Sequence, residues 1–206
     1  MVTTPASILT VMAHPDDAEL WAGGTLALHS QAGAHTTIAV PQTNETRNQE
    51  AAAGAHILGA SLRLLDELTA DTLHDLITEL LPEIVITHNP DDIHPEHQTT
   101  ARTLLAALPH TVITTGHPHR AYTCDGYNNL DRTSHPLTLP TIIDITSTWK
   151  TKQTALAAHT SQPITNHFAP MAETLARLHG HRIGTHYAEA FSPTPILGRL
   201  PATTHL

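Results

Sequence analysis

Short apolar or β-branched runs alternate, over the first half of the chain, with longer segments whose apolar positions repeat at the helical period. The runs predict strands at Ser7–Ala13, Thr36–Pro41, Leu62–Leu65, Ile84–His88 and Thr111–Thr115. The segments between them predict helices at Ala18–Gln31, Arg47–Leu58, Thr72–Leu81 and His97–Leu108. Because strands that alternate with helices of this length form right-handed βαβ units, the pattern predicts a parallel sheet covered by helices.

Beyond Thr115 the alternation weakens. The stretch His117–Arg132 is rich in Tyr, Asn, Asp and Gly and predicts an irregular insertion. The remaining elements are a strand at Thr141–Ile145, helices at Ser147–His159 and Phe168–His179, a last strand at His186–Phe191 and an extended tail at Ser192–Leu206. With no internal repeat and no long linker, we expect one domain over residues 1–206. Its fold is an open, mostly parallel α/β sheet with helices on both faces.

Composition narrows what such a domain can bind. The formal net charge is −9 with only 10 Lys and Arg residues, which argues against nucleic acid and against an anionic membrane surface as partners. The only cysteine, Cys124, excludes a disulfide framework and a cysteine-type zinc site, so a metal would need His, Asp or Glu ligands. We find neither an apolar run of about 18 residues nor a secretory leader pattern, and therefore expect a cytoplasmic protein.

Two clusters of histidine and carboxylate stand out among the 18 histidines of the chain. The first, His14-Pro15-Asp16-Asp17, follows the apolar run Ile8–Met12. The second runs from His88 to His97 directly after Glu83–Thr87, and it ends in His94-Pro95-Glu96-His97. Each marks a change from strand to helix, since proline is favoured in the first helical turn and acids there meet the positive end of the helix dipole. Ligand sites of open α/β sheets lie at such strand ends.

The spacing inside each cluster favours a shared metal site. His14 and Asp17 are three residues apart, as are His94 and His97, so each pair can lie on one face of a first helical turn. If the strand order is 3-2-1-4-5, the strands before the two clusters are neighbours and the clusters meet. A catalytic zinc takes about three ligands from the protein. His14, Asp17 and His97 fit that set, with Zn²⁺ as the expected ion and another divalent cation as the alternative.

This choice leaves Asp16 and His94 beside the metal. A carboxylate there can accept a proton from an attacking water, and an imidazole can stabilise the oxyanion that forms. Glu96 could hydrogen-bond a ligand imidazole and fix its tautomer. The competing interpretation is that Asp16 and Asp17 are only favourable acids at a helix N-terminus, and that His94 or His97 is a surface residue. Two matching clusters, at strand ends that the topology brings together, favour the metal site.

The same residues resemble motifs of the PIG-L/LmbE-like deacetylase family. That family has an Ala-His-Pro-Asp-Asp opening after its first strand and a His-Pro-Asp-His motif after a later one, which here stand as Ala13–Asp17 and His94–His97. The resemblance extends over nearly the whole chain. Its further matches are Thr46-Arg47 with Glu50, Leu58-Gly59, Lys152 to Ala155 with His159, Ser161 and Gln162, and Tyr187-Ala188-Glu189-Ala190-Phe191.

The resemblance implies a Rossmann-like fold and zinc-dependent hydrolysis of an N-acyl amide, in the family often the acetyl group of an N-acetylglucosamine unit. Carried over motif by motif, His14, Asp17 and His97 would bind zinc. Asp16 would be the general base, and His94 would stabilise the oxyanion or help to deliver a proton.

The chain departs from the family pattern at three places. Ala18 separates the paired aspartates from Glu19, where the family often has Glu directly. Glu96 replaces Asp in the second motif and keeps its charge. Thr43-Asn44-Glu45 stands where the family often has Gly-Glu, so the substrate contacts of that loop are left open.

Some residues are candidates for contact with the substrate. The guanidinium of Arg47 can hydrogen-bond sugar hydroxyls or carboxylates, and the alternative is an arginine on a helix surface. His159 either lines the pocket or only caps the end of its helix. In the insertion, Tyr122, Asp125 and Tyr127 could shape a lid, with an ordinary exposed loop as the alternative.

Three functional classes follow. The first is a metal-dependent deacetylase that acts on an amino-sugar-containing small molecule. The second is an amidase for a thiol conjugate or another acyl amide in secondary metabolism, and the third is a non-catalytic sugar-binding relative. We favour the first, and the presence of Asp16 beside a complete ligand set argues against the third. The sequence leaves open the acyl-bearing substrate and the oligomeric state, and it is compatible with a homo-oligomer.

Overall fold

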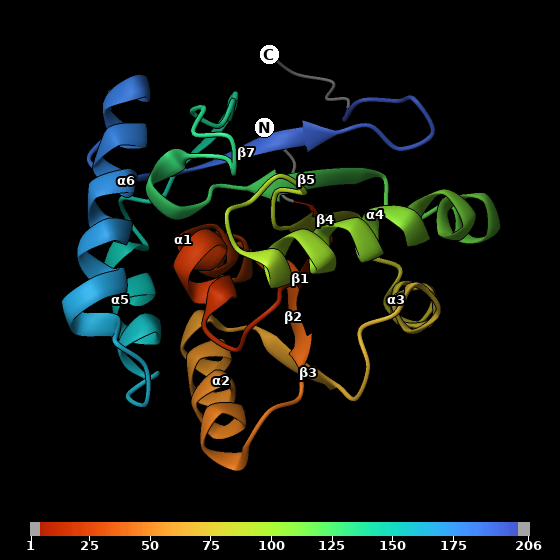
Figure 1. Ribbon diagram of the computed structural model, residues 1–206, viewed down its shortest axis with the longest axis horizontal. Coiled ribbons are helices and arrows are strands. Elements are labelled where there is room, and N and C mark those ends of the chain that lie inside the picture. Colours follow the sequence, from red (N-terminus) through yellow and green to blue (C-terminus); the bar gives the residue numbers. More distant parts are fainter. Residues whose placement is uncertain (1–4, 202–206) are drawn as a thin grey trace.

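A seven-stranded sheet organises residues 5–201, the part of the chain that the computed structural model describes (Figure 1). Its strands are β1 Ser7–Val11, β2 His35–Pro41, β3 Ser61–Leu65, β4 Ile84–Thr87, β5 Arg120–Cys124, β6 Thr141–Asp144 and β7 Ala188–Thr194. The helices are α1 Asp17–Gln31, α2 Glu45–Leu58, α3 Ala70–Leu80, α4 Pro95–Thr115, α5 Trp149–Ala157 and α6 Ala169–Ile183. Tyr127–Asn129 forms a 3-10 turn and Ile164–Phe168 a π-helical turn.

The strands lie in the order β3-β2-β1-β4-β5-β7-β6. The first five strands of this order, β3-β2-β1-β4-β5, are parallel to one another. Strand β7 runs antiparallel to both of its neighbours, β5 and β6. The expected order of the first five strands is confirmed, and with it the neighbouring position of β1 and β4. Thr10 of β1 pairs with Ile86 of β4, so the two strands end at the same edge of the sheet.

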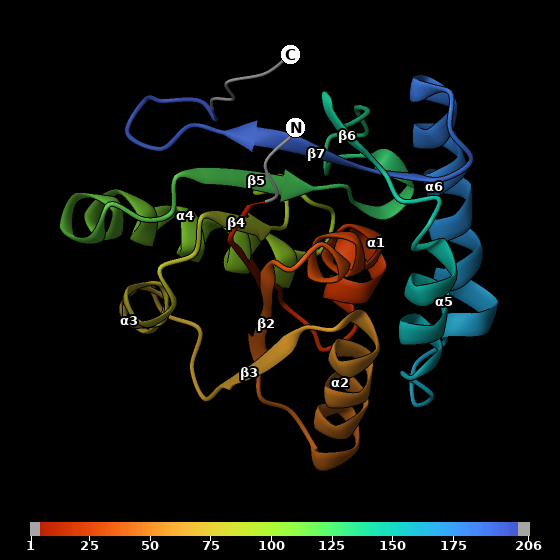
Figure 2. The ribbon, with the colours of Figure 1, turned by 180° about the vertical axis from the view of Figure 1, so that it is seen from behind.

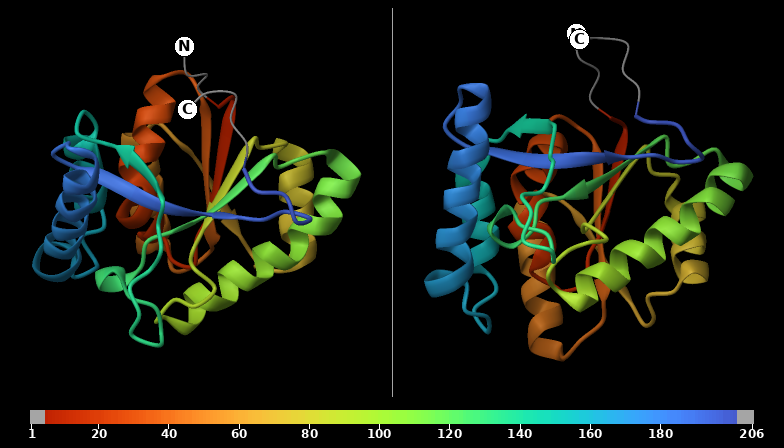
Figure 3. Two further views of the ribbon diagram at one scale, coloured as in Figure 1. Left: turned by 90° about the horizontal axis from the view of Figure 1, so that it is seen from above. Right: turned by 45° about the horizontal axis from the view of Figure 1, so that its top comes forward.

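Alternating side chains of the central strands supply two cores. Ile8 of β1 and Ile86 of β4 face one side, where they pack with apolar residues of α1, α2, α5 and α6. Leu9 and Val85 face the other side and pack with α3 and α4. Figures 2 and 3 show these two groups of helices on opposite faces of the twisted sheet. The expected open α/β sheet with helices on both faces is therefore confirmed.

The fifth strand is not where the sequence pattern placed it. Thr111–Thr115, expected as a strand, forms the last turn of α4, which continues through Pro109. The hydroxyl of Thr111 donates to the carbonyl of Ala107 at 2.8 Å, and that of Thr115 to the carbonyl of Thr111 at 2.7 Å. A β-branched run after a proline is typical of a strand, but here the threonine hydroxyls bond helical carbonyls. Strand β5 lies instead inside the segment expected to be an irregular insertion.

The end of the chain also differs from its prediction. The tail expected over Ser192–Leu206 begins inside β7, which extends to Thr194 and pairs Pro193 with Tyr122 of β5. Residues 202–206 of that tail lie outside the described residues. Within residues 5–201, no helix has both the length and the apolar character that crossing a bilayer requires.

Candidate active site

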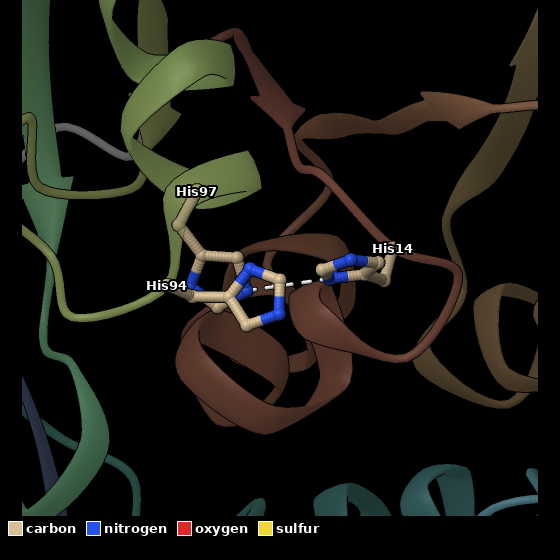
Figure 4. Close-up of side chains that lie close together, drawn as sticks. All are labelled: His14, His94 and His97. Carbon is tan, nitrogen blue, oxygen red and sulfur yellow. Dashed lines mark hydrogen bonds between the residues drawn. The ribbon is translucent and has the colours of Figure 1, made fainter.

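The two histidine clusters meet at the carboxyl edge of the sheet. The first connects β1 to α1, and the second leads from β4 into α4, with β1 and β4 adjacent. Figure 4 shows the rings of His14, His94 and His97 gathered between the first turns of these helices. Fold topology thus brings together segments that are about 80 residues apart, as the doubly wound strand order requires.

Three donor atoms form a triangle of the size that one metal ion needs. His14 Nδ1 lies 2.9 Å from Asp17 Oδ2, and His97 Nε2 lies 3.3 Å from His14 Nδ1 and 3.4 Å from Asp17 Oδ2. Ligand atoms about 2.1 Å from a tetrahedral ion lie about 3.4 Å from one another. The expected donor set therefore fits a single cation, while ligation by these residues remains a prediction.

The neighbourhood offers two further donor sets. His14, His94 and His97 present ligand atoms within 4.8 Å of one another, and so do Asp17, His88 and His97. Both sets contain His97 and differ in whether a cation would lie toward the open side of the site or toward its buried side. The set His14, Asp17 and His97 lies between these alternatives and leaves His94 and His88 as its neighbours.

Carboxylates stand behind both imidazoles of the expected donor set. Glu96 Oε2 lies 2.5 Å from His14 Nε2, which leaves His14 Nδ1 directed at Asp17. Asp92 Oδ2 lies 3.2 Å from His97 Nδ1, and Asp92 Oδ1 accepts the backbone N–H of His94 at 2.7 Å. Such partners fix the tautomer and the orientation of a ligating ring. The expected contact of Glu96 with an imidazole is thus present on His14.

Charge in the site is concentrated on Asp17. Burial raises the pKa of Asp17, yet the surrounding histidines, His88 first, hold it well below its ordinary value. Burial lowers the pKa of His97, but Asp17 and Asp92 outweigh that effect and raise it to about 9. Without a cation, the His97 imidazolium therefore offsets part of the negative charge of these two carboxylates. A metal ion bound there would replace that proton.

His94 faces the site as a neutral donor. It is the N-cap of α4, where its Nδ1 accepts the N–H of Glu96 at 3.3 Å. Burial and the neighbouring His97 and His14 lower the pKa of His94, so the ring is neutral near pH 7. Because Nδ1 accepts, the hydrogen lies on Nε2, which can donate to an oxygen in the site.

Asp16 is the N-cap residue of α1 and is paired with Arg47 from the first turn of α2. Arg47 Nη2 donates to Asp16 Oδ1 at 3.2 Å. Burial, and next the charge of Asp17, raise the pKa of Asp16, whereas Arg47 opposes the rise. A carboxylate whose pKa is raised toward neutrality is a stronger base. Arg47 therefore acts on Asp16 and is not an isolated arginine on the helix surface.

A cavity of about 210 Å³ opens over these side chains. It is lined by His14, Asp16, Asp17, Leu20, Arg47, His94, Tyr127, Gln162 and Phe168. Tyr127, from the expected insertion, packs edge-on against Trp21 with ring centroids 5.3 Å apart. By contrast, Tyr122 lies on β5, and Asp125 is buried, with its Oδ2 2.6 Å from His179 Nε2. Of the three insertion residues considered from the sequence, Tyr127 is the one that lines this cavity.

His159 does not line the cavity, contrary to the expectation of a substrate contact. Its side chain is fully buried, with Nε2 3.4 Å from Glu19 Oε1. Burial lowers the pKa of His159, but Glu19 raises it overall. Nor is capping the role observed, because α5 ends at Ala157 and the ring points at α1 instead. The polar side chain that this region supplies to the cavity is Gln162.

The sequence analysis missed several of these residues for different reasons. Asp92 precedes His94 by two positions, and an Asp that accepts the N–H two residues later is a recognisable turn signal. His88 begins the second cluster, but its spacing to the other histidines assigns it no role. Phe168 and Gln162 reach the cavity from a distant part of the chain, which no local pattern reveals.

Comparisons with known proteins were made on this basis. Residues 9–108 match the family model PIG-L, described as GlcNAc-PI de-N-acetylase, and this range contains both clusters. The chain is similar to the structure of N,N'-diacetylchitobiose deacetylase from Pyrococcus horikoshii, with 21% identity and a TM-score of 0.74 over 93% of this chain and 84% of that chain.

Two more solved structures share the fold. The 4-carboxy-2-hydroxymuconate hydratase GalB from Pseudomonas putida KT2440 is 22% identical, with a TM-score of 0.78 over 97% of this chain and 98% of that chain. The zinc-inhibited form of teicoplanin deacetylase Orf2 is 19% identical, with a TM-score of 0.71 over 91% of this chain and 97% of that chain. Likeness at this level of identity establishes a common fold, and the chemistry has to be argued from the site.

Proposed function

Because residues 9–108 belong to the PIG-L family, we propose that this protein is a metal-dependent hydrolase that removes an N-acyl group, in the first instance acetyl, from an amino-sugar-containing small molecule. One observation carries the proposal. Asp16 and His94 line the same cavity as His14 and Asp17 of the donor triangle and are not members of that triangle.

Zinc is the cation we propose, since two imidazoles and one carboxylate with an open position are typical of catalytic zinc. Held by His14, Asp17 and His97, it would act as a Lewis acid toward the amide carbonyl and lower the pKa of water. Teicoplanin deacetylase Orf2, whose structure shares this fold, is described in a zinc-inhibited form, so the assay below also compares other divalent ions.

The side chains of the site can then carry the proton transfers. Asp16 accepts a proton from the water whose oxygen attacks the carbonyl carbon. His94 donates from Nε2 to the carbonyl oxygen as negative charge develops there. When the C–N bond breaks, Asp16 returns the proton to the leaving nitrogen, and the products are a carboxylate and a free amine. Arg47 keeps the Asp16 carboxylate directed at the cavity through its 3.2 Å contact.

The cavity supports a substrate of about one sugar ring. Its volume of about 210 Å³ is at the small end for a binding site. Tyr127 and Phe168 offer apolar faces to the ring of a sugar, and Arg47 and Gln162 offer donors to its hydroxyls. The deacetylase named in the family description and that of Pyrococcus horikoshii are in keeping with this class of substrate.

A hydratase is the second candidate, because GalB shares the fold over nearly the full length of both chains. An activated water would then add to a carbon–carbon double bond of an unsaturated carboxylate, and no amine would be released. Arg47 is a suitable partner for such a carboxylate.

An amine-release assay separates these possibilities. Protein stripped with a chelator is reloaded with one equivalent of Zn²⁺, Co²⁺ or Mn²⁺ and incubated with a panel of N-acetylated amino sugars. We expect stoichiometric amine and acetate from at least one substrate, and none after the metal is removed. Protein that demonstrably binds metal but releases no amine from any panel member would contradict the proposal.

A further inference from the structure

A fourth imidazole, that of His88, lies behind the donor triangle. It belongs to the first residue after β4, and its side chain is fully buried. His88 Nε2 accepts the backbone N–H of Ala13 at 3.1 Å and lies 3.2 Å from Asp17 Oδ2. The ring also stacks on that of His97, with centroids 3.8 Å apart and planes inclined by 11°. The buried His88 side chain thus contacts the backbone of Ala13 and two residues of the donor triangle, Asp17 and His97.

Of the two ring nitrogens of His88, Nε2 is the one that makes a hydrogen bond. The other nitrogen, Nδ1, is buried and has no hydrogen-bond partner among residues 5–201. An unpaired buried polar atom is unfavourable, so a ring that served only to fill space would be better replaced by an apolar one. The hydrogen bond that Nε2 accepts from Ala13, together with the stacking of the ring on His97, offsets that loss.

Asp17 Oδ2 is the point on which these contacts converge. It accepts the backbone N–H of His14 at 2.8 Å, and it lies 2.9 Å from His14 Nδ1 and 3.2 Å from His88 Nε2. Because Ala13 begins the segment that carries two of the three donor atoms, the bond from its N–H to His88 Nε2 restrains that segment at its start. The His14 N–H then links the start of the segment to the Asp17 carboxylate at its end. This restraint comes from the buried side of the site and leaves the cavity side open.

We propose that His88 is a positioning residue of the metal site. Its Nε2 accepts the N–H of Ala13 and so holds the Ala13–Asp17 segment, with His14 and Asp17 on it, in the geometry that binds the cation. The inference rests on the metal site of the proposed function and adds a residue to it. Loss of a hydrogen-bond partner behind a ligand weakens metal binding by about 10- to 100-fold. We expect a loss of that size when Nε2 is removed.

Two substitutions separate the contacts of Nε2 from the stacking of the ring. His88→Phe keeps an aromatic ring against His97 and loses the nitrogen. His88→Gln loses the ring but can place an amide, with a donor and an acceptor, near the position of Nε2. His74→Phe on α3, away from the site, is the matched control for loss of an imidazole.

The experiment measures Zn²⁺ affinity of the metal-stripped proteins by competition with a chromogenic chelator, and the visible spectrum of each after loading with Co²⁺. We expect His88→Phe to bind Zn²⁺ about 10- to 100-fold more weakly and to show an altered Co²⁺ spectrum. His88→Gln should lie closer to the wild type than His88→Phe, and His74→Phe should match the wild type. Thermal unfolding without metal checks the fold, and His88→Met replaces the Phe variant if that one does not fold.

Wild-type affinity and spectrum in the Phe variant, or weaker binding by Gln than by Phe, would overturn the inference and leave the proposed function intact. Failure of the wild-type protein to bind Zn²⁺ or Co²⁺ at all would instead overturn the proposed function, and the inference with it.

Discussion

Asp92 Oδ2 lies 3.2 Å from His97 Nδ1, and both side chains are completely buried. Asp92 also accepts the backbone N–H of His94 through its other carboxylate oxygen. One carboxylate therefore orients the ring of an expected metal ligand and fixes the start of the helix that carries it. Glu96, which the sequence suggested as a partner of a ligand imidazole, contacts the other imidazole of the donor set, that of His14.

Replacing Asp92 should weaken metal binding. Asp92→Asn keeps a hydrogen-bonding side chain but loses the charge that holds His97 Nδ1–H, so we expect Zn²⁺ affinity to fall about tenfold. Asp92→Ala should lower it further, because it also leaves the buried N–H of His94 without its partner. Chelator competition measures both, and an Ala variant with wild-type affinity would show that Asp92 does not orient the ligand.

Asp16→Asn should abolish turnover without loss of the metal. The amide cannot accept the proton of the attacking water, and removal of a general base lowers kcat by about 10²- to 10⁴-fold. The donor triangle does not include Asp16, so metal content by elemental analysis should stay at the wild-type level. An Asp16→Asn enzyme with wild-type turnover would remove Asp16 from the role of base.

The pH profile should respond to Arg47. Asp16 acts as a base in its deprotonated form, so kcat/KM rises as the pH rises through the pKa of Asp16. The charge of Arg47 lowers that pKa, against burial and Asp17, which raise it. In Arg47→Gln the acidic limb of the profile should therefore move to higher pH. A limb that stays in place or moves to lower pH would mean that Arg47 does not control the ionisation of Asp16.

Gly54 of α2 should tolerate no side chain. A Cβ at this position would lie 2.3 Å from Glu19 Oε1 and 3.0 Å from His159 Nε2, both buried. We expect Gly54→Ala to lower the free energy of unfolding by about 1–3 kcal/mol, as overpacking does. Thermal unfolding measures the effect, and Ala52→Ser, exposed on the same helix, should change stability by only about 0.5 kcal/mol. Equal stability of Gly54→Ala and the wild type would show that the side chains of Glu19 and His159 can move to accommodate the added methyl group.

The sequence predicted those parts of the fold in which apolar residues recur with the period of a strand or a helix. Apolar runs such as Ile84–His88 predicted the central strands, and the doubly wound order placed the first cluster beside the second. The pattern failed at Thr111–Thr115, where Val112 packs on the core, His74 of α3 contacts the Thr111 hydroxyl at 2.9 Å, and threonine hydroxyls bond helical carbonyls. Local composition could not reveal such a tertiary and side-chain effect.

Some residues of the site could likewise be predicted from the sequence, and others could not. Residues spaced three apart at strand ends, such as His14 and Asp17, could be predicted because one helical turn brings them together. His88 is buried behind those residues, and its relevance depends on its contact with Ala13, 75 residues away, which spacing does not encode. Asp92 contacts His97 within the same segment, and its turn toward His94 is a signal that the sequence does carry. For His159 the sequence left open a place at the cavity or a cap on its helix, and the structure shows neither, because the ring turns toward α1 and lies 3.4 Å from Glu19.

The central claim is that one cation is held by His14, Asp17 and His97 with Asp16 free beside it. Its most direct test is a crystal structure of the zinc-loaded protein with anomalous data collected at the zinc absorption edge. The account predicts one anomalous peak about 2.1 Å from His14 Nδ1, Asp17 Oδ2 and His97 Nε2, with Asp16 outside the coordination sphere. A peak bound by His88 in place of His14, or no peak at this edge of the sheet, would contradict it.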